Sequence, residues 1–337
     1  MLALQLDAIN QVVALRDVPV PTPAAGEILV KLHAAALNHR DVFIQHGQYA
    51  GIKLPCTLGS DGAGEVAAHG PNVPADAPAV GSRALINPGL RWGDNPRVQA
   101  RDFVVLGMPD SGTFAEYISL PARYIRPLPA HLTFEQGAAL PLAGLTAYRA
   151  AFTRAQVQAG ERVLVTGIGG GVAMLAAQLC IACGADVWIT SGSDDKLARA
   201  QALLGARGGI NYHADNWVKT LTQQAGGAFD VIIDSAGGAA FGPLLDAAAP
   251  GGRIVFFGGT LGSIPDLPPA KVFWKQLSIL GSTMGTEQDF DALLALVTEQ
   301  KIVPVVDEVF PLAEGEAALR RLEAGSQFGK VVLKITE

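Results

Sequence analysis

The sequence predicts an α/β protein in which a doubly wound parallel sheet is inserted into a mostly β region. The first part of the chain, to about residue 125, is rich in Pro and Gly and carries short alternating runs such as residues 27–32 (EILVKL). From about residue 130, apolar strands alternate with Ala-rich helical segments. We therefore expect one domain from residues 1–125 with 286–337, and a second from residues 126–285.

The elements of the second domain follow one another in the order expected of a parallel sheet. Thr133 and Gln136 have capping-box spacing, which predicts a helix start. Near-continuous apolar strands are typical of a sheet covered on both faces. Strands are expected at 162–166, 186–190, 230–234, 253–258 and 277–281, with a helix after the first and another at 196–204.

The last segment of the chain reads as two helices and a strand. Thr286 is a good N-cap, and the apolar spacing after it predicts a helix to about residue 300. A second helix is expected at 313–324, ended by Gly325, and a final strand at 330–335.

Composition excludes several classes of protein. The 337 residues are enough for about two domains. With 49% hydrophobic and 17% charged residues, the chain is neither disordered nor a coiled coil. The net charge of −6, without any Lys/Arg cluster, argues against a nucleic-acid partner.

The chain is expected to be cytoplasmic and to avoid membranes. The N-terminal residues lack a basic segment and reach Asp7 before any long apolar run, which is unlike a secretory signal. The longest uncharged stretch, between Arg162 and Asp186, is interrupted by glycines and leaves about 13 helical residues where a span needs about 20. Three unevenly placed cysteines do not make a disulfide framework.

A glycine-rich loop follows the first strand of the second domain. Residues 167–173 (GIGGGVA) lie between a strand and a helix, where glycines let the backbone approach a pyrophosphate and Ala173 lets the helix pack closely. The strict G-x-G-x-x-G spacing is only partly met, because the third glycine position counted from Gly167 is Val172. A tight structural turn is the alternative, but the βαβ context favours dinucleotide binding.

The end of the second strand favours NADP(H) over NAD(H). It reads ITSGS, without the carboxylate that would bind the ribose hydroxyls of NAD. The hydroxyls of Ser191 and Ser193, with Lys196 and Tyr212, suit a 2′-phosphate, whereas the two aspartates at 194–195 weaken this interpretation. The alternative is that the two serines only cap the following helix.

Several separated segments resemble one known family. They are residues 36–41 (ALNHRD), 58–66 (LGSDGAGEV), 112–117 (GTFAEY), the glycine loop and 328–333 (FGKVVL). These segments occur in the same order along the chain as in the medium-chain dehydrogenase/reductase superfamily. They make the chain most similar to its zinc-independent, quinone oxidoreductase-like branch. The resemblance implies a Rossmann NADP(H)-binding domain inserted in a GroES-like catalytic domain.

No metal is expected. Where zinc-dependent members of the superfamily hold a catalytic zinc with Cys, His and Cys, this sequence has Asn38, Ser60 and Leu142. None is a thiolate or imidazole ligand. The stretch that matches the structural zinc lobe, residues 87–111, contains no cysteine.

The resemblance also implies site residues. It places Asn38, Asp41 and Tyr49 near the nicotinamide and the substrate, although Asn38 could instead cap a helix and Asp41 could form only a local turn. Lys330 matches a position that often contacts phosphate, with an ordinary exposed strand lysine as the alternative. The implied cofactor-binding residues are Thr146, Gly169, Gly170, Gly171, Val172, Ala173, Ser191, Ser193, Lys196, Tyr212, Ser235, Ala236, Gly237, Phe257, Gly258, Gly259 and Lys330.

These expectations lead to a hypothesis about function. Without a metal to polarise a ketone, hydride transfer from NADPH is favoured toward a quinone or an α,β-unsaturated carbonyl, where the incoming charge is delocalised. Reduction of another carbonyl or an enoyl group, or non-enzymatic NADPH binding as in crystallin-like relatives, remain alternatives. The resemblance implies a homodimer formed through an edge strand of the cofactor domain.

Overall fold

The computed structural model describes residues 1–336, which form two compact units. Unit 1 contains Met1–Leu142 and the segment that begins at Thr286, and unit 2 is Ala143–Gly285. The first division lies later than the expected residue 126 because α2 (Phe134–Ala138) packs on the sheet of unit 1. Gly137 in this helix lies so close to that sheet that an added Cβ would come 3.3 Å from the Cβ of Ala63.

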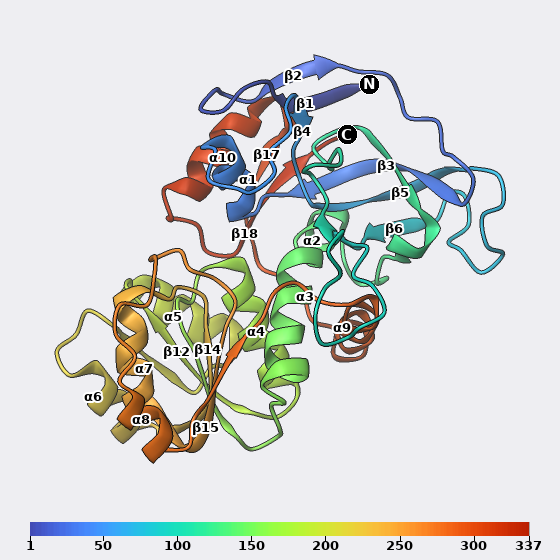
Figure 1. The fold of residues 1–337 in the computed structure, drawn as a ribbon. Helices are drawn as coiled ribbons and strands as arrows, with labels where there is room; N and C mark the ends of the chain where they lie inside the picture. The colour runs from blue at the N-terminus through green and yellow to red at the C-terminus, as the bar shows by residue number, and fades with distance from the viewer. Residues whose placement is uncertain (337) are drawn as a thin grey trace. The chain divides into compact units, whose positions relative to one another are not determined.

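Unit 1 is mostly β, as expected (Figure 1). Its main sheet has the order β10-β6-β5-β3-β18-β17, and β9 also pairs with β3. The strands are β3 (Glu27–Ala36), β5 (Asp61–His69), β6 (Arg83–Ile86), β9 (Tyr117–Pro121), β10 (Ile125–Pro127), β17 (Val306–Pro311) and β18 (Lys330–Lys334).

Smaller sheets and three helices complete unit 1. One sheet has the order β2-β1-β4, and β7 pairs with β8. These strands are β1 (Leu2–Leu6), β2 (Ala14–Asp17), β4 (Cys56–Thr57), β7 (Gly89–Leu90) and β8 (Val104–Val105); the helices besides α2 are α1 (His39–Gln45), α9 (Glu287–Gln300) and α10 (Gly315–Glu323).

The core of unit 1 follows from the alternation in β3. Ile28, Val30 and Leu32 are completely buried, while the residues between them are half-buried. This period of two places one face of the strand in an apolar cluster. The last three residues of the strand, 34–36, are all buried, so the segment that follows β3 begins in the interior of unit 1.

Unit 2 confirms the predicted parallel sheet. All of its strand pairs are parallel, in the order β13-β12-β11-β14-β15-β16. That order is the doubly wound arrangement in which ligands bind at the carboxyl ends of the strands. The strands are β11 (Arg162–Val165), β12 (Asp186–Ser191), β13 (Gly208–Asn211), β14 (Phe229–Asp234), β15 (Ala248–Phe256) and β16 (Ser278–Gly281).

Helices alternate with these strands (Figure 1). They are α4 (Gly171–Ala182), α5 (Asp194–Leu204), α6 (Trp217–Gln224), α7 (Phe241–Ala247) and α8 (Pro269–Trp274), while α3 (Pro141–Tyr148) crosses the division between the units. No helix in the described part of the chain has the length and apolar character that a bilayer crossing requires.

Two predicted helix starts are confirmed at the level of single hydrogen bonds. The Oγ1 atom of Thr286 accepts from the backbone N–H of Asp289 at 2.9 Å, and the Asp289 carboxylate accepts from the N–H of Thr286 at 2.9 Å. Thr133 and Gln136 make the same reciprocal pair at the start of α2.

Candidate active site

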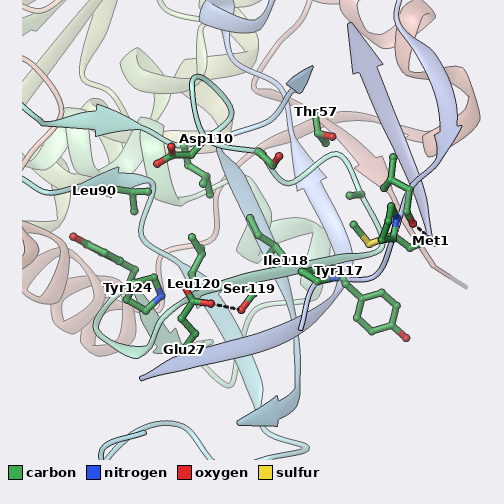
Figure 2. Close-up of a pocket in the computed structure, with 18 of the residues that line it drawn as sticks. Met1, Glu27, Thr57, Leu90, Asp110, Tyr117, Ile118, Ser119, Leu120 and Tyr124 are labelled. Carbon is green, nitrogen blue, oxygen red and sulfur yellow. Dashed lines mark hydrogen bonds between the residues drawn. The ribbon is translucent and has the colours of Figure 1, made fainter. Parts of the chain in front are cut away.

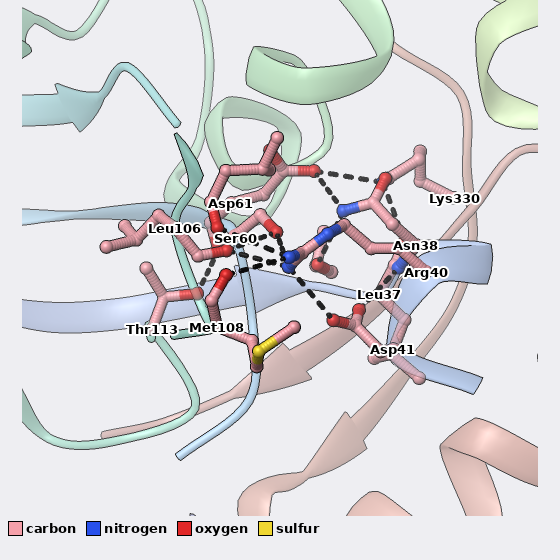
Figure 3. Close-up of polar contacts among 12 residues, drawn as sticks. Leu37, Asn38, Arg40, Asp41, Ser60, Asp61, Leu106, Met108, Thr113 and Lys330 are labelled. Carbon is pink, nitrogen blue, oxygen red and sulfur yellow. Dashed lines mark hydrogen bonds and ion pairs between the residues drawn. The ribbon is translucent and has the colours of Figure 1, made fainter. Parts of the chain in front are cut away.

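Strand pairing brings three distant residues of unit 1 together at the end of β3. Ala36, near the end of this strand, pairs with Asp61 of β5 on one side and with Val332 of β18 on the other. Asn38 lies two residues after the end of β3 and caps α1, while Lys330 is the first residue of β18. The register therefore places Asn38, Asp61 and Lys330 in one cluster (Figure 3).

Lys330 is a buried ammonium with three acceptors. Its Nζ atom donates to Asn38 Oδ1 at 2.6 Å, to Asp61 Oδ2 at 3.0 Å and to the carbonyl oxygen of Leu37 at 2.7 Å. The exposed fractions of Asn38, Asp61 and Lys330 are 8%, 0% and 5%. All three N–H donors of the ammonium are used, as a buried charge requires.

The arrangement rules out the exposed-lysine alternative for Lys330. Its side chain is buried, because Asp61, the carbonyl oxygen of Leu37 and the side chain of Asn38 hold the ammonium inside unit 1. Asn38 is the N-cap residue of α1, as the alternative had it, and its backbone N–H donates to Asp41 Oδ2 at 2.8 Å. Its Nδ2 atom donates to Asp61 Oδ2 at 2.9 Å, so the carboxamide faces the ion pair.

The three positions that match the zinc ligands gather around Asp61. Asn38 donates to one carboxylate oxygen, and the backbone N–H of Leu142 donates to the other at 2.7 Å. Ser60 precedes Asp61, and its hydroxyl donates to Leu106 O at 2.7 Å while accepting from Arg40 at 2.8 Å. An amide, an occupied hydroxyl and an aliphatic side chain do not fit zinc.

The described residues, 1–336, contain no group of three or more His, Cys, Asp or Glu side chains arranged to hold a metal ion.

Arg40 is a site residue that sequence reasoning missed. Its guanidinium is buried and donates to the carbonyl oxygens of Leu106 at 2.8 Å and Val105 at 3.2 Å, so it ties α1 to the loop after β8. The same guanidinium lies 5.0 Å from the ring centroid of Tyr49, which is half-buried against an apolar cluster. The sequence feature that could have indicated its burial is its place in the segment ALNHRD (residues 36–41), directly after an apolar strand.

Asp41 lies inside the fold of unit 1. Its side chain is completely buried, and Oδ2 accepts from the backbone N–H of Asn38 at 2.8 Å. Burial raises the pKa of this carboxyl to about 6, against the opposing effect of the Arg40 guanidinium 4.0 Å away. Asp41 thus forms the local hydrogen-bonded turn given as the alternative.

His39 is exposed at the start of α1, next to this cluster. Packing around the imidazole and the positive charge of Lys330 both lower the pKa of His39. Both effects favour the neutral imidazole.

In unit 2, the glycine loop has the geometry of a phosphate cradle. Gly167 and Gly169 adopt φ angles of +66° and +119°, which side chains rarely allow. The N–H of Ile168 donates to Thr190 O at 2.8 Å, which fixes the loop to β12. Gly170 then caps α4, and Gly171, Val172 and Ala173 form its first turn, where backbone N–H groups lack partners within the helix.

Asp234 organises the neighbouring loop, and sequence reasoning missed it. Its buried carboxylate accepts from Thr166 Oγ1 at 2.6 Å and from the N–H of Gly237 at 2.8 Å and of Ala236 at 3.2 Å. An added Cβ at Gly167 would come 3.2 Å from Ser235 Oγ. The glycine loop and residues 235–237 therefore adjoin at the carboxyl ends of β11 and β14.

The remaining predicted residues extend this edge of the sheet. The N–H of Phe257 donates to Asp234 O at 3.2 Å, so the segment with Gly258 and Gly259 follows β15 beside residues 235–237. Thr146 is buried in α3, where its hydroxyl lies 3.9 Å from Met284 Sδ. Unit 2 thus brings the predicted residues after β11, β14 and β15 to one edge.

A polar cluster lies at the end of β12. Ser193 caps α5 by accepting from the N–H of Lys196 at 3.3 Å, which matches the capping alternative for this serine. Ser191 is buried, and its hydroxyl accepts from the N–H of Ser193 at 3.2 Å. The aliphatic part of Lys196 crosses the glycine loop, since an added Cβ at Gly169 would come 2.9 Å from Lys196 Cδ.

Tyr212 and His213 complete the cluster, and His213 was not predicted. An added Cβ at Gly192 would come 2.7 Å from Tyr212 Oη and 3.0 Å from His213 Nε2. The absence of a side chain at Gly192 therefore leaves room for both polar tips. Asn211 holds this turn through its side chain, which accepts from the N–H of His213 at 3.0 Å.

A separate cavity of about 550 Å³ lies in unit 1 (Figure 2). Residues of β9 line it, together with Met1, Leu90 and Asp110. None of the predicted site residues lines this cavity. Its carboxylates already have partners, because Ser119 donates to Glu27 at 2.9 Å and Arg91 contacts Asp110 at 3.0 Å.

Comparisons with known proteins identify the family. The model for the alcohol dehydrogenase GroES-like domain matches residues 24–130, and the model for zinc-binding dehydrogenase matches residues 171–299. The chain therefore belongs to the medium-chain dehydrogenase/reductase superfamily, as the motifs indicated. It is an oxidoreductase of this type, in a family whose members bind a nicotinamide cofactor.

Individual relatives have different names. The chain is 35% identical to a zinc-type alcohol dehydrogenase-like protein, YogA, of Leptosphaeria maculans, over 95% of this chain and 94% of that protein. It is 31% identical to quinone oxidoreductase of Homo sapiens, over 94% and 92%. A solved structure described as an NAD-dependent alcohol dehydrogenase is 40% identical, with a TM-score of 0.94 and full coverage of both chains.

Proposed function

We propose that the protein transfers a hydride from NADPH to a quinone or an α,β-unsaturated carbonyl, without a metal ion. The observation that carries this proposal is the replacement of a zinc-type ligand set by Asn38, Ser60 and Leu142 around Asp61, with the Lys330 ammonium as the local cation. No step of the proposed reaction passes through zinc.

The residues of unit 2 fit a nicotinamide dinucleotide. The positive φ angles of Gly167 and Gly169 and the start of α4 provide backbone N–H groups for a pyrophosphate. Residues 235–237 and 257–259 provide the adjoining edge. When bound, the cofactor supplies the hydride, and the protein has to orient it and exclude water.

The cluster at the end of β12 supports a preference for NADPH. Lys196, Tyr212 and His213 offer a cation, a phenol and an imidazole, and β12 ends in Ser191 where NAD-binding relatives of this fold carry a carboxylate.

The aspartates that weakened this interpretation have partners of their own. Asp194 accepts from Asn211 at 3.0 Å, and Asp195 lies 3.8 Å from the Arg199 guanidinium. The Arg199 guanidinium therefore offsets part of the negative charge of Asp195, while Asp194 keeps its charge and is bound to Asn211.

Asn38 suits a donor role toward the acceptor substrate. Reduction of a quinone or enone moves negative charge onto an oxygen, which a fixed N–H donor stabilises. The amide nitrogen of Asn38 is such a donor. A simple ketone would require stronger polarisation, which a zinc ion supplies in other members of the family.

A substrate panel tests the proposal. NADPH oxidation is followed with 1,4-benzoquinone and with a simple conjugated enone, and NADP⁺ reduction is followed with simple alcohols. We expect turnover with a quinone or enone to exceed alcohol oxidation. Faster alcohol oxidation would overturn the proposal, and NADPH binding without turnover on any acceptor would instead support a non-enzymatic binding protein.

We also propose a homodimer and a cytoplasmic location. The strand β16 is an edge of the parallel sheet, and in α8 beside it Phe273 and Trp274 are 63% and 84% exposed. Such an edge and apolar surface are typical of a subunit contact. Light scattering is expected to give twice 35.0 kDa, and the monomer mass would contradict it. The three free cysteines suit a reducing compartment.

A further inference from the structure

We propose that Lys330 is a positioning residue that fixes the orientation of the Asn38 carboxamide, so that Asn38 acts only as a hydrogen-bond donor. This inference rests on the proposed function, because it assigns a role within the same site. Lys330 itself is not proposed to touch the substrate. Its ammonium is enclosed by Asp61, Leu37 and Asn38 (Figure 3).

The two ends of the Asn38 carboxamide face groups of opposite charge. Its Oδ1 atom accepts from the Lys330 ammonium at 2.6 Å, and its Nδ2 atom donates to the Asp61 carboxylate at 2.9 Å. A rotation of the amide by 180° would place N–H groups against the ammonium and the oxygen against the carboxylate. Both contacts would then become repulsive, so the ion pair selects one orientation.

This orientation decides what Asn38 can offer to a ligand. The oxygen is occupied by a charged donor, and one N–H is occupied by Asp61. The other contact of Nδ2 is a long one, 3.5 Å to Ala36 O. At that distance the hydrogen bond is weak, so this N–H is the group of the carboxamide that a substrate or ribose oxygen can recruit.

The ion pair between Lys330 and Asp61 is itself held in place by other contacts. Leu142 N–H donates to Asp61 Oδ1 at 2.7 Å, and Thr113 donates to its backbone oxygen at 2.7 Å. Lys330 is fixed by strand pairing between β17 and β18. A rigid ion pair keeps the Asn38 amide in one orientation. The amide N–H is then a preorganised donor that needs no rearrangement when negative charge develops on the substrate oxygen.

A double-mutant cycle tests whether Lys330 acts through Asn38. The variants are Lys330→Met, Asn38→Ala and the combination, each assayed for kcat and for the Kd of NADPH. We expect Lys330→Met to lower kcat about tenfold and Asn38→Ala about 100-fold, the usual range for one lost donor. The combination should be no slower than Asn38→Ala alone.

Several outcomes would overturn the proposal. Losses that add in the combined variant would show that Lys330 acts independently of Asn38, and unchanged kcat in Lys330→Met would show that it does not act at all. If Lys330→Met fails to fold, Asp61→Asn with Lys330→Met removes both buried charges together, which proteins tolerate better. That pair variant should show the same reduced kcat and the same lack of additivity with Asn38→Ala.

A second measurement does not depend on turnover. Proton exchange of the Asn38 side-chain amide, assigned by its loss in Asn38→Ala, is followed by NMR in the full-length protein. We expect exchange about tenfold faster in Lys330→Met and unchanged in Lys219→Ala, an exposed lysine of α6. Equal exchange in both variants would contradict the positioning role even if the wild type reduces quinones, whereas absent turnover with the expected exchange would reject only the proposed function.

Discussion

The Nζ atom of Lys330 lies 3.0 Å from Oδ2 of Asp61, and the two side chains are 5% and 0% exposed. The pairing of β18 and β5 with opposite edges of β3 creates this contact, between residues that are 269 positions apart in the chain. The two charges neutralise each other inside unit 1. Loss of either one alone leaves the other buried without a counter-charge.

Asp61→Asn is therefore expected to destabilise the protein strongly. Removing one partner of a buried pair lowers the free energy of unfolding by about 3–5 kcal/mol. Urea unfolding measures this change. The matched control is Asp291→Asn, which breaks the contact of a half-exposed carboxylate with Arg126 and should cost less than about 1 kcal/mol. Equal effects of the two substitutions would contradict the account of the buried pair.

Asp41 makes stability depend on pH in a predictable direction. Burial raises the pKa of its carboxyl from 3.8 in the unfolded chain to about 6 in the folded protein, so the folded state binds the proton more tightly. The stabilisation from this carboxyl is fully present below about pH 4 and is lost as the pH rises through 6. The difference in pKa corresponds to about 3 kcal/mol.

Asp41→Asn removes this titration while keeping the size of the side chain. Unfolding free energies of the wild type and Asp41→Asn are compared by urea titration at pH 4.5, 5.5 and 7. The wild type should lose stability relative to the variant as the pH rises. A difference that stays constant, or that grows in favour of the wild type, would show that folding does not raise the pKa of this carboxyl.

Lys196→Ala is expected to weaken NADPH binding more than NADH binding. An ammonium that contacts the 2′-phosphate through a charged hydrogen bond contributes about 1.5–3 kcal/mol, which is about ten- to 100-fold in Kd. Fluorescence titration with both nucleotides measures the two constants. Lys219→Ala, on the surface of α6, is the control and should change neither. A parallel loss of affinity for both nucleotides would remove Lys196 from the phosphate site.

Gly192→Ala is expected to disturb the same site from the other side. The new Cβ would come 2.7 Å from Tyr212 Oη and 3.0 Å from His213 Nε2, so both polar tips have to move. NADPH affinity should fall, while NADH affinity should change less. Gly242→Ala in α7 is the matched control, because its Cβ would meet nothing within 4 Å and should leave both affinities unchanged. Unaltered NADPH binding in Gly192→Ala would argue against a role for these two side chains.

The parallel sheet was predictable because its strands are apolar runs bounded by glycine turns. Val163, Leu164 and Val165 are completely buried, as such a run requires. The strand β13 was not predicted, since residues 208–211 (GGIN) contain two glycines and one apolar side chain. Only its pairing with β12 makes it a strand.

The glycine loop and the polar end of β12 were also accessible from the sequence, because their residues are neighbours in the chain. The environment of Lys330 was not. In the segment KVVLK (residues 330–334) the sequence cannot show whether Lys330 is exposed or buried. Its counter-charge, Asp61, comes from another strand of the sheet. Asp234 was missed for a related reason. Its partner Thr166 directly follows β11, the strand that pairs with β14, and the two residues are far apart in the sequence.

The central claim is hydride transfer from NADPH without a metal ion. The most direct test strips the protein of metal with a chelator, verifies the metal content by mass spectrometry, and measures NADPH oxidation by 1,4-benzoquinone and a conjugated enone before and after addition of Zn²⁺. The account predicts the same rate in the stripped, untreated and zinc-supplemented protein. Activity that disappears on stripping and returns with Zn²⁺ would contradict it.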